Sequence, residues 1–209
     1  MKRSIRITLA AIFILIGVMD VMAIEEATYT VVEKDNKFEI RDYTPYILAE
    51  TIVEGNLKDA GNKAFRILFR YISGANRSRK KVAMTAPVSQ RPQGEKIEMT
   101  APVGQRPVQE NWAVSFMMPS SYSLKTLPEP EDPNITLRQV PARRMAVVRY
   151  SGFWSEKGYL RCKSELESWI QERGLTIVGD PIWARYNSPF TPWFLRRNEI
   201  LIPIDTYPE

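Results

Sequence analysis

Hydrophobic and polar residues alternate along the first third of the chain in a way that predicts strands followed by a helix. Aromatic and β-branched residues, which are typical of strands, dominate three short segments. The strands expected there are 29–32, 38–40 and 46–53. Residues 56–73 follow with apolar positions at helical spacing, which indicates a helix. Asn56 is suited to cap its first turn, and Gly74 is suited to end it.

The same order of elements is predicted a second time. Residues 155–173 have helical spacing of apolar positions, with Ser155 as the expected cap and Gly174 as the end. The strands expected in this part are 112–118, 134–140, 145–150, 182–186 and 199–204. Two strand-strand-helix-strand-strand halves of this kind favour a mainly antiparallel sheet with helices packed on it, which is an α+β fold. Two independent subdomains are the alternative, and each would be too small to bury both faces well.

A short repeat follows the first predicted helix. Residues 81–92 (KVAMTAPVSQRP) recur as residues 96–107 (KIEMTAPVGQRP), with nine of the twelve positions identical. Its period is too short for a solenoid, whose units run to roughly 20–50 residues. We expect each copy to be a strand, 81–88 and 96–103, that ends at proline and is followed by a Gln-Arg-Pro turn.

The N-terminal segment is typical of a signal peptide. Lys2, Arg3 and Arg6 precede an uncharged run of about 13 residues, which is short of the roughly 20 that a membrane-spanning helix needs. Small residues at Val21 and Ala23 suit cleavage after Ala23. We therefore expect a signal peptide over 1–23, a single domain over 24–209, and export to the periplasm or outside the cell. The alternative is an uncleaved anchor, which would be the chain's only membrane contact.

Composition narrows the possible chemistry. The mature chain would keep 26 basic and 23 acidic residues, a net charge of about +3, which does not predict nucleic-acid binding. The chain has no histidine, so histidine cannot serve as a general base, a zinc ligand or an axial haem ligand. Cys162, the single cysteine, lies in the second predicted helix, and we interpret it as a small core residue.

Several ordered motifs together resemble the SOUL haem-binding family. They are the two Met-Thr-Ala-Pro-Val segments, the stretch 116–122 (FMMPSSY), Leu127-Pro128-Glu129-Pro130, and Arg196-Arg197-Asn198-Glu199. The resemblance covers about residues 29–204. It implies a pseudo-twofold α+β fold, a distorted antiparallel β-barrel flanked by two long helices. It also implies that haem or a porphyrin lies against the first helix, near the loop before the last strand.

The resemblance carries over to particular residues of this chain. Phe65, Leu68, Phe69 and Ile72 form an apolar stripe on the first predicted helix, and Arg70 stands where a relative has a basic partner for a propionate. Phe190 and Trp193 would supply an aromatic wall from the last loop. Met84 and Met99 could ligate iron as thioethers, but gap-filling beside a strand is their more ordinary role. We interpret the 196–199 motif as a polar cluster that fixes the last strand.

These observations predict an exported tetrapyrrole-binding protein that acts as carrier, buffer or sensor, with haem or porphyrin held by an apolar pocket without histidine ligation. We expect no enzymatic activity and no metal site built by the protein. The alternative is a binding module for other amphipathic small molecules, which rests on fold-level analogy. An enzyme acting on tetrapyrroles is a weaker alternative, because no paired carboxylates stand out in the sequence.

Overall fold

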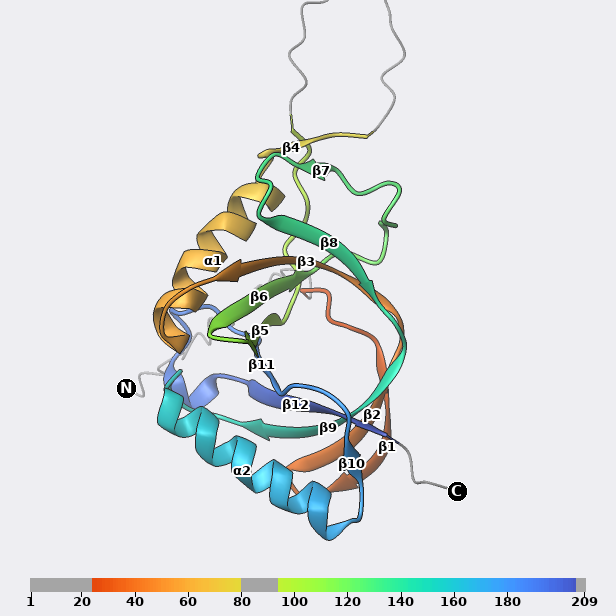
Figure 1. Ribbon diagram of the computed structural model, residues 1–209, viewed down its shortest axis with the longest axis vertical. Coiled ribbons are helices and arrows are strands. Elements are labelled where there is room, and N and C mark those ends of the chain that lie inside the picture. Colours follow the sequence, from red (N-terminus) through yellow and green to blue (C-terminus); the bar gives the residue numbers. More distant parts are fainter. Residues whose placement is uncertain (1–23, 80–93, 206–209) are drawn as a thin grey trace, which may run out of the picture.

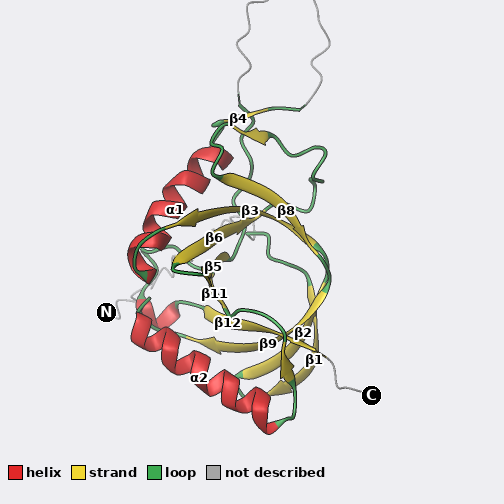
Figure 2. Cartoon of the chain, viewed as in Figure 1, coloured by secondary structure: helices red, strands yellow, loops and turns green. Residues whose placement is uncertain are grey.

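The computed structural model describes residues 24–79 and 94–205, which form a large curved sheet with two long helices on its outside (Figures 1 and 2). The helices are α1 (Leu57–Ile72), α2 (Glu156–Glu172) and the short 3-10 helix η1 (Trp193–Leu195). The first strands are β1 (Tyr29–Asp35), β2 (Phe38–Tyr43), β3 (Tyr46–Val53), β4 (Asn76–Arg77), β5 (Val103–Val108) and β6 (Asn111–Met117). The others are β7 (Glu129–Pro130), β8 (Ile135–Val140), β9 (Arg143–Tyr150), β10 (Thr176–Ile177), β11 (Ile182–Arg185) and β12 (Asn198–Asp205).

The order of strands in the large sheet has an internal twofold symmetry. It runs β1-β2-β9-β12-β11-β5-β6-β3-β8, with β10 added beside β12. The first half contributes β2, β3, β5 and β6, and the second half contributes β8, β9, β11 and β12. Read from β2, the order β2-β9-β12-β11 matches the order β8-β3-β6-β5 read from the other end. The two series meet where β11 pairs with β5. The first strand of each half pairs with a strand of the other half, β2 with β9 and β8 with β3. The duplication predicted from the sequence is therefore present as strand exchange between halves.

The predicted α+β fold is confirmed. The neighbouring strands of the sheet are antiparallel, and the sheet curls around its own interior (Figure 1). Its order ends at β1 on one side and β8 on the other, so the barrel is an open half-barrel.

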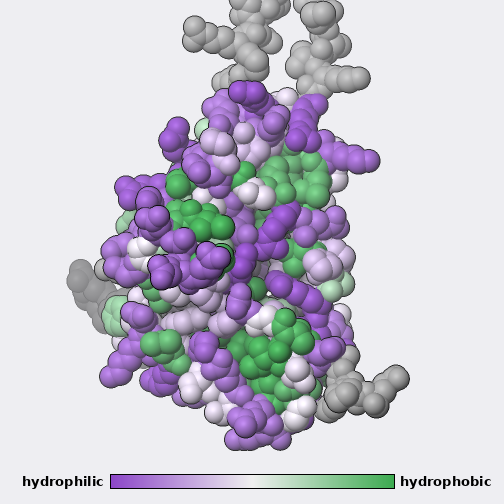
Figure 3. Space-filling model, in the orientation of Figure 1, coloured by the Kyte–Doolittle hydropathy of each residue, from purple (hydrophilic) through white to green (hydrophobic). Residues whose placement is uncertain are grey.

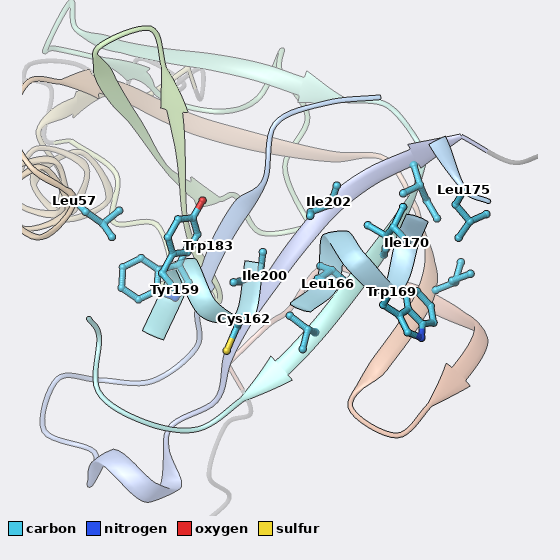
Figure 4. Packing of buried hydrophobic residues seen from close by; sticks show 14 residues of the cluster. Leu57, Tyr159, Cys162, Leu166, Trp169, Ile170, Leu175, Trp183, Ile200 and Ile202 are labelled. Atoms are coloured by element: carbon cyan, nitrogen blue, oxygen red, sulfur yellow. The ribbon is translucent and has the colours of Figure 1, made fainter. Parts of the chain in front are cut away.

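The α2 helix covers one half of the sheet through a large apolar core (Figure 4). Leu166 and Ile170 of α2 pack against Ile200 and Ile202 of β12. Cys162 also lies in this core and is only 2% exposed, and burial raises the pKa of its thiol. This placement agrees with its interpretation as a core residue and leaves it poorly suited to act as a nucleophile.

The α1 helix covers the other half, and strand alternation separates its core from the inside of the half-barrel. Ala49 and Val53 of β3 pack toward Leu68 of α1. Leu48, on the opposite face of β3, belongs with Met117 to a separate cluster inside the half-barrel. One face of β3 therefore packs against α1, and its other face lines the inside of the half-barrel.

The interior also contains a buried ion pair. The Arg41 guanidinium donates to both carboxylate oxygens of Glu199, at 2.8 and 3.1 Å, and the two residues are 2% and 0% exposed. Glu199 also accepts from Tyr186 (2.8 Å) and from Arg197 (2.9 Å). Burial acts to raise the pKa of Glu199, but hydrogen bonds and attraction from Arg41 and Arg197 outweigh it and lower that pKa. The predicted polar cluster at 196–199 therefore does anchor the last strand.

The strand predicted for residues 96–103 is wrong. Residues 94–102 have no regular strand, and β5 begins at Val103, so the Gln-Arg-Pro segment predicted as a turn lies inside β5. Gln105 stays in the strand because its side chain is 1% exposed and donates to the carbonyl of Leu57, at the start of α1 (2.7 Å). This long-range hydrogen bond outweighs the local turn preference. The first copy of the repeat, 81–88, and the predicted signal peptide, 1–23, lie outside the described residues.

We expect Asn56→Ala to lower the free energy of unfolding by about 1 kcal/mol, the usual cost of removing a helix cap. The Asn56 side chain accepts from the Asp59 amide (2.9 Å) and donates to the Asp59 carboxylate (2.7 Å). Urea denaturation of the mature chain measures the change. Asn62→Ala makes the same substitution at an exposed position within α1, where alanine is the better helix former, so its stability should be unchanged or slightly higher. An equal loss of unfolding free energy in Asn56→Ala and Asn62→Ala would contradict a stabilising role of the Asn56 cap.

Candidate functional site

A cavity of about 560 Å³ lies at the C-terminal end of α1. One side of it is the helix, and the other is the irregular segment that precedes β5. Its lining residues are Ile24, Glu25, Phe69, Ile72, Ser73, Lys96, Ile97, Glu98, Met99 and Thr100. The volume lies within the roughly 300–1,000 Å³ typical of small-molecule sites.

Phe69 presents an aromatic face at this cavity while remaining anchored to the core. It is 46% exposed, and its ring stacks on Phe65 at 5.8 Å between centroids. Phe65 in turn makes an edge contact with Phe116 of β6, at 5.3 Å. A row of rings therefore connects the cavity with the sheet, and this support limits the freedom of the Phe69 side chain.

The opposite wall is held in place by hydrogen bonds. Asn76 is 2% exposed, and its side-chain amide donates to the carbonyl of Glu95 (2.8 Å) and accepts from the amide of Glu95 (2.9 Å). The Ile97 amide donates to the carbonyl of Ile72, at the end of α1 (2.8 Å). The Thr100 hydroxyl donates to the carbonyl of Met117. These bonds join a segment without regular structure to α1 and to β6, so the cavity is preformed.

Apolar side chains line the cavity, and charges lie near its rim. Ile24 and Met99 are 54% and 41% exposed, so both can offer apolar surface to a ligand. Lys96 supplies a cation, while Glu25 and Glu98 supply two carboxylates. The Glu25 carboxylate already accepts from the amide of Ser120 (2.8 Å). A ligand with an apolar body and an acidic group directed to Lys96 would match this arrangement.

The structure separates the residues that the sequence predicted on α1. Phe69 and Ile72 line the cavity, and Phe65 supports Phe69 from behind. Leu68 is 0% exposed and packs in the core beneath α1, so it offers no surface to a ligand. Arg70 is exposed on the last turn of α1 and is not among the residues that line the cavity.

Trp193 lies in a different cluster, formed by the loop before β12 and the turn before α2, and Phe190 lies on the same loop. Trp193 stacks on Phe153 at 5.4 Å and makes an edge contact with Phe194 at 5.6 Å. Phe190 is 94% exposed. None of these residues lines the cavity beside α1. The structure therefore does not bring the two predicted parts of the site together in one cavity.

Exposed apolar surface alone does not identify a ligand site in this molecule. Figure 3 shows apolar side chains gathered in patches that a hydrophilic band separates. A patch marks a possible contact surface, whereas a cavity also determines the size and shape of what it can hold. The cavity beside α1 is therefore the better candidate.

The sequence reasoning missed several lining residues because they fall in the segment predicted as a strand. Lys96, Ile97 and Glu98 belong to the second copy of the repeat, and Ile24 stands at the start of the described chain. Met99 was predicted to fill a gap beside a strand or, less ordinarily, to ligate iron, whereas its side chain is 41% exposed at the cavity. The useful signal was the repeat itself, because a lysine, two prolines and a methionine within a dozen residues make a poor central strand.

A flat tetrapyrrole fits this donor set only through apolar contacts and Lys96, the single cation among the described lining residues. Met99 is the residue at the cavity whose side chain could ligate iron as a thioether, and Lys96 could pair with a propionate. Within the described residues, no group of three or more acidic or cysteine side chains is arranged to hold a metal ion. Neither long helix, nor any other described one, has the length and apolar character of a membrane-spanning segment.

Comparison with known proteins gives one family match and several structural matches. The family model described as SOUL heme-binding protein matches residues 24–203. No curated protein matches the chain.

The structural matches agree on the fold. The crystal structure of the EcmrR C-terminal domain aligns with a TM-score of 0.58 at 12% identity, over 86% of this chain and 99% of that one. A hydrolase from Listeria innocua aligns with a TM-score of 0.54 at 10% identity, over 83% of this chain and 94% of that one. At such low identity these similarities concern the arrangement of the chain and do not transfer an activity.

Proposed function

The chain belongs to the SOUL heme-binding protein family, and on that basis we propose that it binds haem or a related porphyrin in the cavity beside α1. The observation that carries the proposal is the preformed cavity in which Phe69 and Ile72 face the segment 96–100. Tetrapyrrole binding is the general role of the family. The particular cavity, the mode of binding and the biological use of the ligand belong to the proposal.

Binding in this cavity would depend on apolar contact more than on iron. The chain has no histidine, so the strongest axial ligand is absent, and Met99 offers only a weak thioether. Phe69 and Met99 are the exposed apolar side chains that would cover the faces of the macrocycle, whereas Ile72 is 3% exposed and lies at the floor of the cavity. Lys96 would pair with a propionate. An interaction of this kind is reversible, which suits a carrier or buffer.

The same chain would act outside the cytoplasm. The basic leader and apolar run before residue 24 support export to the periplasm or beyond, with an uncleaved anchor as the alternative. A reversible tetrapyrrole carrier without catalytic groups would fit that location. We propose no enzymatic step, since among the described residues no hydrogen bond pairs the hydroxyl of Ser73 or Thr100 with Glu25, Glu98 or Lys96.

We expect haemin and metal-free protoporphyrin to bind the mature chain with dissociation constants within about tenfold of each other, a difference of about 1.4 kcal/mol. The reason is that apolar burial and propionate pairing are common to both ligands. Soret absorbance and tryptophan quenching measure the two titrations. Absence of a saturable response to either ligand would overturn the proposal. Binding of haemin alone would show that iron ligation dominates.

A further inference from the structure

A second cavity lies inside the half-barrel and shares no lining residue with the cavity beside α1. Its volume is about 360 Å³. It lies between β3, β6 and β8 on one side and the loop from β10 to β11 on the other. Four arginines line it: Arg106, Arg138, Arg143 and Arg144.

Two of these arginines share one carboxylate. Arg138 donates to both oxygens of Glu50, at 3.1 and 2.9 Å, and Arg106 donates to one of them at 3.1 Å. Glu50 is 8% exposed. Burial acts to raise its pKa, but hydrogen bonds and attraction from Arg138 and Arg106 outweigh it, so the pKa of Glu50 is lowered and the carboxylate stays charged. Two guanidinium groups against one carboxylate leave an excess positive charge at the cavity.

Arg143 adds a donor that the described residues do not use fully. Its terminal nitrogen donates to the hydroxyl of Tyr46 (2.9 Å), a neutral partner. Its Nε is buried and has no hydrogen-bond partner among the described residues. Arg144 is instead paired with Asp42, at 2.6 and 2.7 Å. Arg143 therefore brings to the cavity a charge that its neutral partner does not offset, which favours an anionic group.

An apolar chamber adjoins this charged cavity. It has a volume of about 60 Å³ and shares Leu48, Ser115 and Ile182 with the arginine-lined cavity. The rest of its lining is mainly apolar and aromatic, and includes Met117, Tyr186 and Leu201. The interior of the half-barrel therefore offers a basic mouth that leads into a short apolar recess.

We propose that the interior of the half-barrel binds a small carboxylate with a short aliphatic chain. The carboxylate would accept from Arg143 and Arg106, and the chain would extend into the recess beside Met117. A guanidinium matches a carboxylate because two parallel hydrogen bonds can form. The recess holds only a few methylene groups, so a short acid fits better than a long-chain one. This site is additional to the tetrapyrrole site and does not depend on it.

The charges disfavour a cationic ligand in the same place. Two carboxylates line the cavity, Glu50 and the exposed Asp180, against four arginines, so the lining remains basic. Glu50 is matched by Arg138 and Arg106. A cation that approached Glu50 would have to displace an arginine and would then leave that arginine unpaired. An anion requires no such exchange.

Titration with hexanoate tests the proposal, followed by calorimetry and by the methyl signal of Met117 in protein labelled at methionine methyl groups. We expect saturable binding that shifts this signal, with hexylamine and inorganic phosphate each at least about tenfold weaker, a difference of about 1.4 kcal/mol. Absence of saturation, equal binding of hexylamine, or phosphate binding as strong as that of hexanoate would overturn the proposal.

Variants locate the site. Arg143→Gln should weaken hexanoate binding at least about tenfold and leave haemin affinity unchanged, which separates this site from the cavity beside α1. Arg106→Gln provides a second test if the first variant does not fold. Arg161→Gln is the matched control, because this arginine is 69% exposed on α2 and outside the cavity. A folded Arg143→Gln or Arg106→Gln with unchanged hexanoate affinity would overturn the assignment.

Discussion

Replacing Glu199 with leucine should lower the free energy of unfolding by roughly 3–5 kcal/mol, the cost expected when one partner of a buried ion pair is removed. The substitution would remove the bidentate carboxylate partner of Arg41 at a position that is 2% exposed, and would leave Glu39, which accepts from the Nε of Arg41 at 2.7 Å. It would also remove the acceptor for Tyr186 and Arg197. Urea denaturation near neutral pH measures the loss.

Two further variants isolate the cause. The double variant Arg41→Met with Glu199→Leu should recover part of the stability, because no buried arginine then loses its partner. Glu165→Leu on α2 removes only exposed ion pairs, with Lys37 and with Arg161, and should cost less than about 1 kcal/mol. A loss below about 1 kcal/mol for Glu199→Leu would contradict the importance of the buried pair.

The pH dependence has a definite sign. The folded-state pKa of Glu199 is lowered, so its stabilising contribution is fully present above the unfolded value of about 4.3 and is lost as the pH falls through the folded value. The difference between the native chain and Glu199→Leu should therefore be largest near neutral pH. It should shrink below about pH 4.

Replacing Phe69 with alanine should weaken porphyrin binding by about 10- to 100-fold, since covering a phenylalanine side chain contributes about 1.5–3 kcal/mol. Phe69 is 46% exposed, so the fold should lose little of its stability. Haemin and metal-free protoporphyrin should be affected alike, because the contact is with the macrocycle. Soret titration of the variant beside the native chain gives both affinities.

Two controls place the ligand. Leu160→Ala removes an equally exposed apolar side chain from α2, away from the cavity, and should leave the affinity unchanged. Phe190→Ala tests the exposed aromatic loop directly. If Phe190→Ala abolished binding while Phe69→Ala did not, the ligand would lie on that loop and the assignment to the cavity beside α1 would be wrong.

Much of the fold could be predicted from the sequence because local signals agreed with tertiary packing. The α1 helix begins after Asn56 and ends before Gly74, and α2 begins after Ser155, as the caps predicted. The segment before β5 failed because distant partners determine its conformation. The Asn76 side chain donates to the carbonyl of Glu95, and the amide of Ile97 donates to the carbonyl of Ile72. Neither hydrogen bond could be predicted from a local sequence pattern.

The candidate site could be predicted only in part for the same reason. Helical spacing identified the stripe that contains Phe69 and Ile72, and both line the cavity. The spacing could not show that Leu68 faces the core, because the apolar side chains of α1 cover a wide arc. Part of that arc is buried, as at Leu68, and part is exposed, as at Phe69. Phe190 and Trp193 looked compatible with the same site, although whether two segments far apart in the chain meet is a matter of tertiary structure.

Strand exchange between the two halves affects how the molecule can come apart. Since β2 pairs with β9 and β8 pairs with β3, neither repeat can detach without breaking the edge of the other. We therefore expect the duplicated halves to unfold together rather than one at a time.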